Sequence, residues 1–161
     1  MVYGGARMGY IEELRSLVGH RPLIFVGSVV IVQDSNDRIL LQQRKHPFGA
    51  WGIPGGLMEL GETAEDTARR ELLEEAGITI GELELIDVFS GPQNFIKAPN
   101  GDEFYVVTIA YSTRSFTGQP FINDAESLDL KFFDLQEVPE LVKSHRVILE
   151  RFLAKNNTLL R

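Results

Sequence analysis

Three glutamates in the middle of the chain, Glu71, Glu74 and Glu75, have the spacing that places side chains on one face of a helix. At three and four residues apart they lie within an arc of about 100°. Like charges placed in this way repel one another, and each pair costs an isolated helix roughly 0.2–0.5 kcal/mol. A divalent cation turns the repulsion into attraction, and oxygen ligands suit Mg²⁺ or Mn²⁺. The spacing therefore indicates a magnesium or manganese site, although a solvated acidic helix face has the same pattern.

The residues around the glutamates extend this pattern in both directions. Residues 56–78 read GLMELGETAEDTARRELLEEAGI, in which Gly56, Glu62 and Arg70 precede the acidic run. This segment resembles the Nudix box, G-x5-E-x7-R-E-U-x-E-E-x-G-U with U an aliphatic residue, and it meets every fixed position. The preceding WGIPGG, residues 51–56, is similar to the usual lead-in of that family.

The resemblance implies an activity as well as a fold. Nudix-like enzymes hydrolyse a nucleoside diphosphate linked to another group, by attack of water on phosphorus and usually with Mg²⁺ or Mn²⁺. Phosphoryl transfer needs mainly charge neutralisation, positioning and an activated water, which metal ions on carboxylates can supply. We therefore expect a metal-dependent pyrophosphohydrolase that cleaves a phosphoanhydride bond.

By the same resemblance, Glu71, Glu74 and Glu75 are metal ligands, and the backbone carbonyl of Gly55 completes the site. One carboxylate near the metal has to act as the general base. Within the box the candidates are Glu71 and Glu75. Glu126, in the loop before the last strand, is a more distant candidate, with an ordinary loop acid as the alternative.

Other residues near the box are candidates for orienting or binding roles. We expect Arg70 to pair with a glutamate and fix its orientation, as in relatives. Glu62 either joins the metal shell or favours the helix N-terminus. Gly55 and Gly56 indicate backbone conformations that a side chain would forbid, and close approach of a phosphate or metal. Arg44 either binds phosphate through its planar donors or makes a surface ion pair.

The substrate is less clear from the sequence. Relatives that hydrolyse ADP-ribose carry a proline about fifteen residues after the box, and neither Pro92 nor Pro99 has that spacing. Phe95 occupies a position where relatives that hydrolyse diadenosine polyphosphates have a tyrosine. It either stacks on a base or packs onto the core. The expected partner is therefore a nucleotide-type small molecule.

Composition fits one small enzyme domain. The chain has 161 residues, 43% hydrophobic and 24% charged, which is ordinary for a globular domain. It has no cysteine, so a disulfide framework is excluded and a reducing cytoplasm is compatible. The net charge of −7 argues against a nucleic acid polymer as partner. No apolar run is long enough for a membrane span, and we expect a cytoplasmic monomer or homodimer.

Hydrophobic periodicity predicts the elements that position the box. Residues 1–9 are Gly-rich and aperiodic and are expected to be disordered, with the first seven a possible cloning or start-codon artefact; residues 10–161 form one domain. The pattern predicts helices over Tyr10–Val18, Glu62–Ala76 (closed by Gly77) and Pro139–Lys155, and strands over Leu23–Val32, Arg38–Arg44, Leu83–Ser90, Glu103–Thr113 and Leu128–Phe133.

The first two strands are expected to form a hairpin around a turn at residues 34–37. Segments Gly91–Asp102 and Thr117–Asn123 are expected to be loops. The order of elements predicts an α/β fold with a mixed sheet between helical layers, and the Nudix resemblance implies the same α/β/α sandwich.

Two other functions on this fold were considered. A nucleotide-binding sensor that does not cleave its ligand is the alternative, but such relatives typically lose box glutamates, and this chain keeps them. An isoprenoid diphosphate isomerase needs a reactive cysteine, which is absent. His145 lies on the apolar stripe of the last helix, where we expect it to be a packed histidine.

Overall fold

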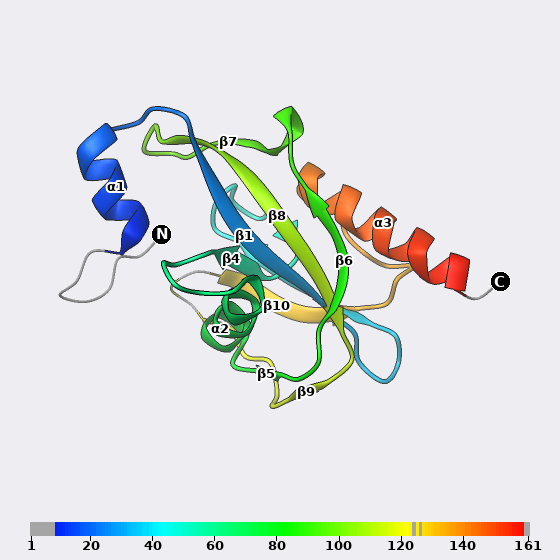
Figure 1. The fold of residues 1–161 in the computed structure, drawn as a ribbon. Helices are drawn as coiled ribbons and strands as arrows, with labels where there is room; N and C mark the ends of the chain where they lie inside the picture. The colour runs from blue at the N-terminus through cyan, green and yellow to red at the C-terminus, as the bar shows by residue number, and fades with distance from the viewer. Residues whose placement is uncertain (1–8, 124, 126, 160–161) are drawn as a thin grey trace.

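The main sheet holds the centre of the molecule. The structure, a computed structural model, describes residues 9–159 except 124 and 126. Its strands follow the order β4 (Gly55–Leu57), β1 (Leu23–Val32), β8 (Glu103–Thr113) and β6 (Glu84–Phe89), and β7 (Phe95–Lys97) also pairs with β8 (Figure 1). β1 runs parallel to β8, whereas the other pairs are antiparallel. The sheet is therefore mixed, as predicted.

Two smaller sheets complete the strand arrangement. One has the order β10 (Ser127–Phe133), β2 (Ile39–Arg44) and β3 (Trp51–Gly52), and the other pairs β5 (Thr79–Ile80) with β9 (Phe116–Thr117). The predicted turn between the first two long strands is present and is closed by the antiparallel bridge from Gln33 to Ile39, but the predicted pairing of the two strands is wrong, because they lie in different sheets. β8 pairs with β1 along the whole length of one edge of β1, and β4 pairs with the middle of β1. β2 therefore pairs in the second sheet.

Helices cover both faces of the main sheet. Alternate residues of β1 point to opposite faces, as a strand requires. Val30 and Val32 pack with α2 (Ala64–Ala76), whereas Val29 and Ile31 pack with α3 (Lys143–Leu159). The first helix, α1 (Tyr10–Val18), lies beside the start of β1 (Figure 1). The predicted α/β/α architecture is confirmed.

The glutamate-bearing helix has well-defined ends. Thr63 is its N-cap and accepts a hydrogen bond from the Asp66 amide at 3.0 Å, while the Asp66 carboxylate accepts from the Thr63 amide at 3.1 Å. This reciprocal capping box satisfies two amides that the helix leaves free. At the other end Gly77 adopts a left-handed conformation (φ 68°) and its amide donates to Leu73 O. The predicted closure at Gly77 is confirmed.

The segment predicted as the loop Gly91–Asp102 contains regular structure. It holds a short 3₁₀ helix, η1 (Pro92–Asn94), followed by β7, which pairs with the start of β8 through a tight turn. The prediction missed this hairpin because three residues are too short for an alternating pattern to be recognised. The expected disorder falls on residues 1–8, outside the described part of the chain. No helix among the described residues is long and apolar enough to cross a membrane.

Candidate active site

The glutamates of α2 lie over the glycine pair of β4. A Cβ on Gly56 would overlap the carboxylate of Glu71, so that carboxylate lies directly against the bare Cα. The Gly55 amide donates a hydrogen bond to Glu75 Oε2 at 3.3 Å. The Glu75 side chain is also a neighbour of Glu71, and its hydrogen bonding lowers the pKa of the Glu71 carboxyl. Two of the three predicted ligands therefore meet at the glycines, while the Glu74 side chain is 58% exposed.

Arg70 links the acidic side chains on this side of the helix. Its guanidinium binds Glu62 with two hydrogen bonds, at 2.6 and 2.9 Å. The same group donates to Glu71 Oε1 at 2.9 Å, to Glu74 Oε2 at 3.3 Å and to the backbone carbonyl of Leu57 at 3.0 Å. Such a planar fork suits bidentate binding of carboxylates. Arg70 therefore contacts three glutamates rather than the single one that we expected.

Glu62 precedes the helix rather than starting it. Besides Arg70, its carboxylate accepts hydrogen bonds from the Glu59 amide at 2.8 Å and from the Thr67 hydroxyl at 3.1 Å. The hydrogen bond from Arg70 is the main cause that lowers the pKa of Glu62, and the Glu59 amide adds to it. Since these partners occupy the carboxylate oxygens, Glu62 is placed to hold Arg70.

The Glu71 carboxyl is largely buried, with its side chain only 14% exposed. Burial raises its pKa, the charge and hydrogen bond of Arg70 oppose that rise, and the negative charge of Glu74 adds to it. A buried carboxylate beside two others is stabilised by a proton or by a cation. This property favours cation binding at Glu71.

The acidic side chains of the site offer oxygen donors for a divalent cation. In the described part of the chain, no three acidic or histidine side chains converge closely enough to enclose an ion as they stand. Arg70 binds Glu71 and Glu74, while Glu75 turns toward the Gly55 amide. The chemistry nevertheless fits Mg²⁺ or Mn²⁺, because all donors are oxygens on one helix face beside a backbone turn.

The glycine pair is explained by close packing. A Cβ on Gly55 would overlap the backbone carbonyl of Ser28 in β1, and a Cβ on Gly56 would overlap Glu71. The neighbours that exclude a side chain in the structure are β1 and a glutamate, and the expected approach of a phosphate or metal stays a prediction. Glycine lets β4 pack tightly between the neighbouring strand and the helix.

Arg44, at the end of β2, reaches the same cluster from the other side. It is partly buried, and burial lowers the pKa of its guanidinium while the negative charge of Glu75 opposes this effect. The guanidinium therefore interacts with the charge of Glu75, and it forms no surface ion pair with another of the described residues. An inward-facing guanidinium next to carboxylates is well placed for an anion that arrives with its own cation.

Comparison with known proteins identifies the family. A family model described as the NUDIX domain matches residues 24–152. The chain belongs to the Nudix hydrolase family. An ADP-ribose pyrophosphatase of Methanocaldococcus jannaschii is 30% identical over 128 residues, which span 79% of this chain and 72% of that one.

Solved structures agree with this assignment. The crystal structure of a MutT Nudix hydrolase from Burkholderia pseudomallei matches with a TM-score of 0.68 at 31% identity, and the match covers 80% of this chain and 98% of that chain. The Nudix domain of Shewanella oneidensis NrtR, solved in complex with ADP ribose, matches with a TM-score of 0.66 at 25% identity over 92% of this chain and 99% of that chain. The prediction of a Nudix hydrolase from the box residues is confirmed.

Phe95 is not brought to the Nudix glutamates by any described contact. Phe95 lies on β7, 41% exposed, with its ring 5.1 Å from that of Tyr105. It packs on a neighbouring strand, neither in the core nor against the box helix. Glu126 lies outside the described residues. Two described residues near it in the chain border the site. The side-chain amide of Asn123 donates to Glu74 O at 3.2 Å, and Ser127 pairs with Arg44.

Sequence reasoning missed one residue of the site. The imidazole Nδ1 of His145, in the first turn of α3, accepts a hydrogen bond from the Ile53 amide at 2.9 Å. The apolar stripe of α3 correctly indicated burial, but it carried no signal for this contact. A polar residue in the first turn of an apolar stripe was the one available hint.

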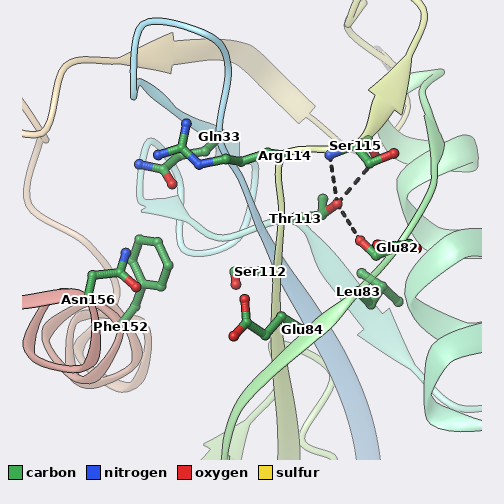
Figure 2. Close-up of a pocket in the computed structure, with 10 residues that line it drawn as sticks. All are labelled: Gln33, Glu82, Leu83, Glu84, Ser112, Thr113, Arg114, Ser115, Phe152 and Asn156. Carbon is green, nitrogen blue, oxygen red and sulfur yellow. Dashed lines mark hydrogen bonds between the residues drawn. The ribbon is translucent and has the colours of Figure 1, made fainter. Parts of the chain in front are cut away.

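A hollow of about 670 Å³ lies elsewhere on the Nudix domain. Figure 2 shows its walls, with Glu82 and Glu84 near the start of β6, Thr113 and Arg114 at the end of β8, and Phe152 on α3. It shares no residue with the glutamate cluster. It is therefore separate from the candidate active site.

Proposed function

We propose that this chain is a metal-dependent pyrophosphohydrolase that cleaves a phosphoanhydride bond in a nucleoside diphosphate linked to another moiety. The observation that carries the proposal is the meeting of Glu71 and Glu75 over Gly55 and Gly56, in a chain of the Nudix family. Burial of a carboxylate between others of the same charge is unfavourable without a cation. A metal-bound pyrophosphate would be a matching ligand.

In this proposal Glu71, Glu74, Glu75 and the Gly55 carbonyl hold Mg²⁺ or Mn²⁺. The ion, when bound, neutralises charge on the pyrophosphate and lowers the pKa of a bound water. One carboxylate takes the proton of the attacking water, with Glu71, Glu75 and Glu126 as candidates.

Two arginines have different proposed roles around these acids. Arg70, fixed by Glu62, holds Glu71 and Glu74 in orientation through its guanidinium. Arg44 faces the cluster from β2 and is proposed to bind a phosphate of the substrate. Phe95 remains a candidate for base stacking because its ring is partly exposed.

ADP-ribose is the first substrate to test. The archaeal relative is described as an ADP-ribose pyrophosphatase, and the Nudix domain of the Shewanella protein was solved with ADP ribose. ADP-ribose is a nucleoside diphosphate joined to another group, as the proposed reaction requires. Neither Pro92 nor Pro99 has the spacing of the ADP-ribose relatives, so a panel has to include other classes.

The test is product release from a panel of nucleotides with and without Mg²⁺ or Mn²⁺. The panel holds ADP-ribose, diadenosine polyphosphates, ordinary and oxidised nucleoside triphosphates, NADH and nucleotide sugars. Metal-dependent turnover of one member, with kcat/KM well above the others, is the expected result. Nucleotide binding without any turnover would overturn the hydrolase and favour the non-cleaving sensor.

Assembly and compartment belong to the same proposal. A monomer or homodimer with no nucleic acid polymer or membrane as partner is expected from the acidic charge, and light scattering measures the assembly directly. The proposed compartment is the cytoplasm, where a chain without cysteine is unaffected by reducing conditions.

A further inference from the structure

The segment that leads into the box, residues 51–56, is fastened to the start of the last helix. The Trp51 carbonyl accepts from the Val142 amide at 2.9 Å, and the Ile53 amide donates to His145 Nδ1 at 2.9 Å. The Pro54 carbonyl then accepts from β1, and the Gly55 amide donates to a glutamate of α2. The backbone of this segment is therefore held first by α3 and then by the site itself.

His145 stays in the neutral form that can accept this hydrogen bond. Its side chain is buried, and burial together with the positive charge of Arg44 holds the pKa of the imidazole well below its usual value. The ring is therefore neutral at ordinary pH. Because Nδ1 accepts from the Ile53 amide, the ring proton resides on Nε2.

The ring and Arg44 share the space over one glycine. A Cβ on Gly52 would stand 2.9 Å from His145 Nδ1 and 3.0 Å from Arg44 Nε. Both groups thus lie against the bare Cα, and neither has room to move toward it. A residue larger than glycine at this position would displace the ring, the guanidinium or both.

We propose that His145 is a positioning residue of the active site, acting on the backbone of Ile53 and on the guanidinium of Arg44. By holding the Ile53 amide it sets the path of the chain into Gly55 and Gly56. By occupying the space over Gly52 it limits the guanidinium to the side that faces the glutamates. This inference rests on the hydrolase function proposed above.

Two replacements of His145 separate positioning from simple packing. His145→Phe keeps a ring of similar size but removes the acceptor, whereas the amide oxygen of His145→Asn can replace Nδ1. We expect kcat to fall at least about tenfold in His145→Phe, because small displacements of catalytic groups are costly. In His145→Asn we expect kcat within about threefold of the wild type, since the acceptor is restored. Equal kcat in His145→Phe and the wild type would overturn the proposal, as would an equal loss in both variants.

A third variant tests the geometry without touching the histidine. Gly52→Ala should reproduce the loss of kcat, and combining it with His145→Phe should add little, because both act on one arrangement. Leu149→Ala, a buried change on the same helix, is the matched control. It should lower the melting temperature and leave kcat at 25 °C unchanged. If Gly52→Ala keeps wild-type kcat, or if Leu149→Ala loses kcat as much as His145→Phe, positioning is wrong.

Hydrogen exchange at the Ile53 amide gives a readout that needs no substrate. Exchange should be slow in the wild type and in His145→Asn, and at least about tenfold faster in His145→Phe. Failure of the wild type to hydrolyse any nucleotide would remove the proposed function, while this exchange result would still decide the contact. Slow exchange in His145→Phe would overturn the role of His145 even if the enzyme is active.

Discussion

The Glu71 carboxylate occupies the space that a side chain on Gly56 would need. The two residues are on different elements, β4 and α2, and their contact brings the acidic face of the helix against the glycine turn. A methyl group at position 56 has to move either the carboxylate or the strand. Because Gly55 pairs with Val29 of β1 beside it, the strand has little freedom.

Gly56→Ala should therefore lose most of its turnover, about 100-fold or more, since the carboxylate is displaced. Gly61→Ala is the matched control, because its positive φ (83°) makes alanine strained while nothing lies within 4 Å of the added atom. The control should cost about 1–2 kcal/mol of stability and keep its kcat. Steady-state kinetics and urea unfolding of both variants measure this. Similar kcat in the two variants would contradict the packing explanation.

Replacing Arg70 should affect stability and turnover together. Arg70→Lys keeps the charge but cannot make the two-point bond to Glu62 while also reaching Glu71. We expect a loss of about 1–3 kcal/mol in unfolding free energy and at least about a tenfold fall in kcat. Arg69→Lys, which alters the neighbouring and more exposed pair with Glu65, should change stability by less than about 1 kcal/mol and leave kcat unaffected. Urea denaturation and initial-rate kinetics distinguish the two.

Removing one charge from the proposed ligands should abolish turnover without unfolding the protein. Glu74 is the best test because its side chain is largely exposed, so Glu74→Gln removes a like charge and little packing, and the amide oxygen can still accept from Arg70. Its kcat should fall at least about 100-fold while its melting temperature stays unchanged or rises. Glu75→Gln should also lose turnover, with a larger structural effect because that residue is buried. A Glu74→Gln variant with wild-type kcat would rule out its role as a metal ligand.

Divalent cations should stabilise the wild-type fold. A ligand that binds only the native state at 100 times its Kd raises the unfolding free energy by about 2.7 kcal/mol. Mg²⁺ or Mn²⁺ should therefore raise the melting temperature, and Glu74→Gln should reduce the rise. Matched ionic strength with NaCl is the control. A melting temperature that responds equally to NaCl and MgCl₂ would argue against the site.

Acid should weaken the fold through His145. Burial and the charge of Arg44 hold the pKa of His145 in the folded protein well below 6.5. Below about pH 6.5 the imidazole is therefore protonated in the unfolded chain but stays neutral in the folded protein. The stability due to the neutral ring is therefore complete above this pH and is lost as pH falls toward the folded pKa, by up to about 1.4 kcal/mol per pH unit. The difference in unfolding free energy between wild type and His145→Asn should shrink from pH 7.5 to pH 5. A constant difference would mean that the ring takes up the same number of protons in the folded and unfolded states.

The box helix and its neighbours could be predicted because their signals are local. The spacing of Glu71 and Glu75 defines a helix face, and Gly77 is typical of a helix end, so neither depends on distant parts of the chain. The strands Leu23–Val32 and Glu103–Thr113 were long enough to be recognised with correct bounds.

What the sequence did not indicate depends on partners far apart in the chain. The alternation in β2 predicts a strand but does not encode that its neighbour is β10 and not β1. The contact of His145 with Ile53 joins residues 92 positions apart, and the apolar stripe around His145 predicts only burial. Arg44 left two alternatives open in the sequence, and its partial burial and interaction with the charge of Glu75 favour the phosphate-binding one.

The fastening of Trp51 and Ile53 to the start of α3 also bears on how the protein is made. During synthesis the glutamates and glycines leave the ribosome long before Val142 and His145, so a nascent chain carries the reactive groups without the clamp that aligns them. β1 likewise has to wait for β8, its parallel neighbour. If His145 positions the site as proposed, we expect hydrolysis to begin only after the last helix has been translated and docked.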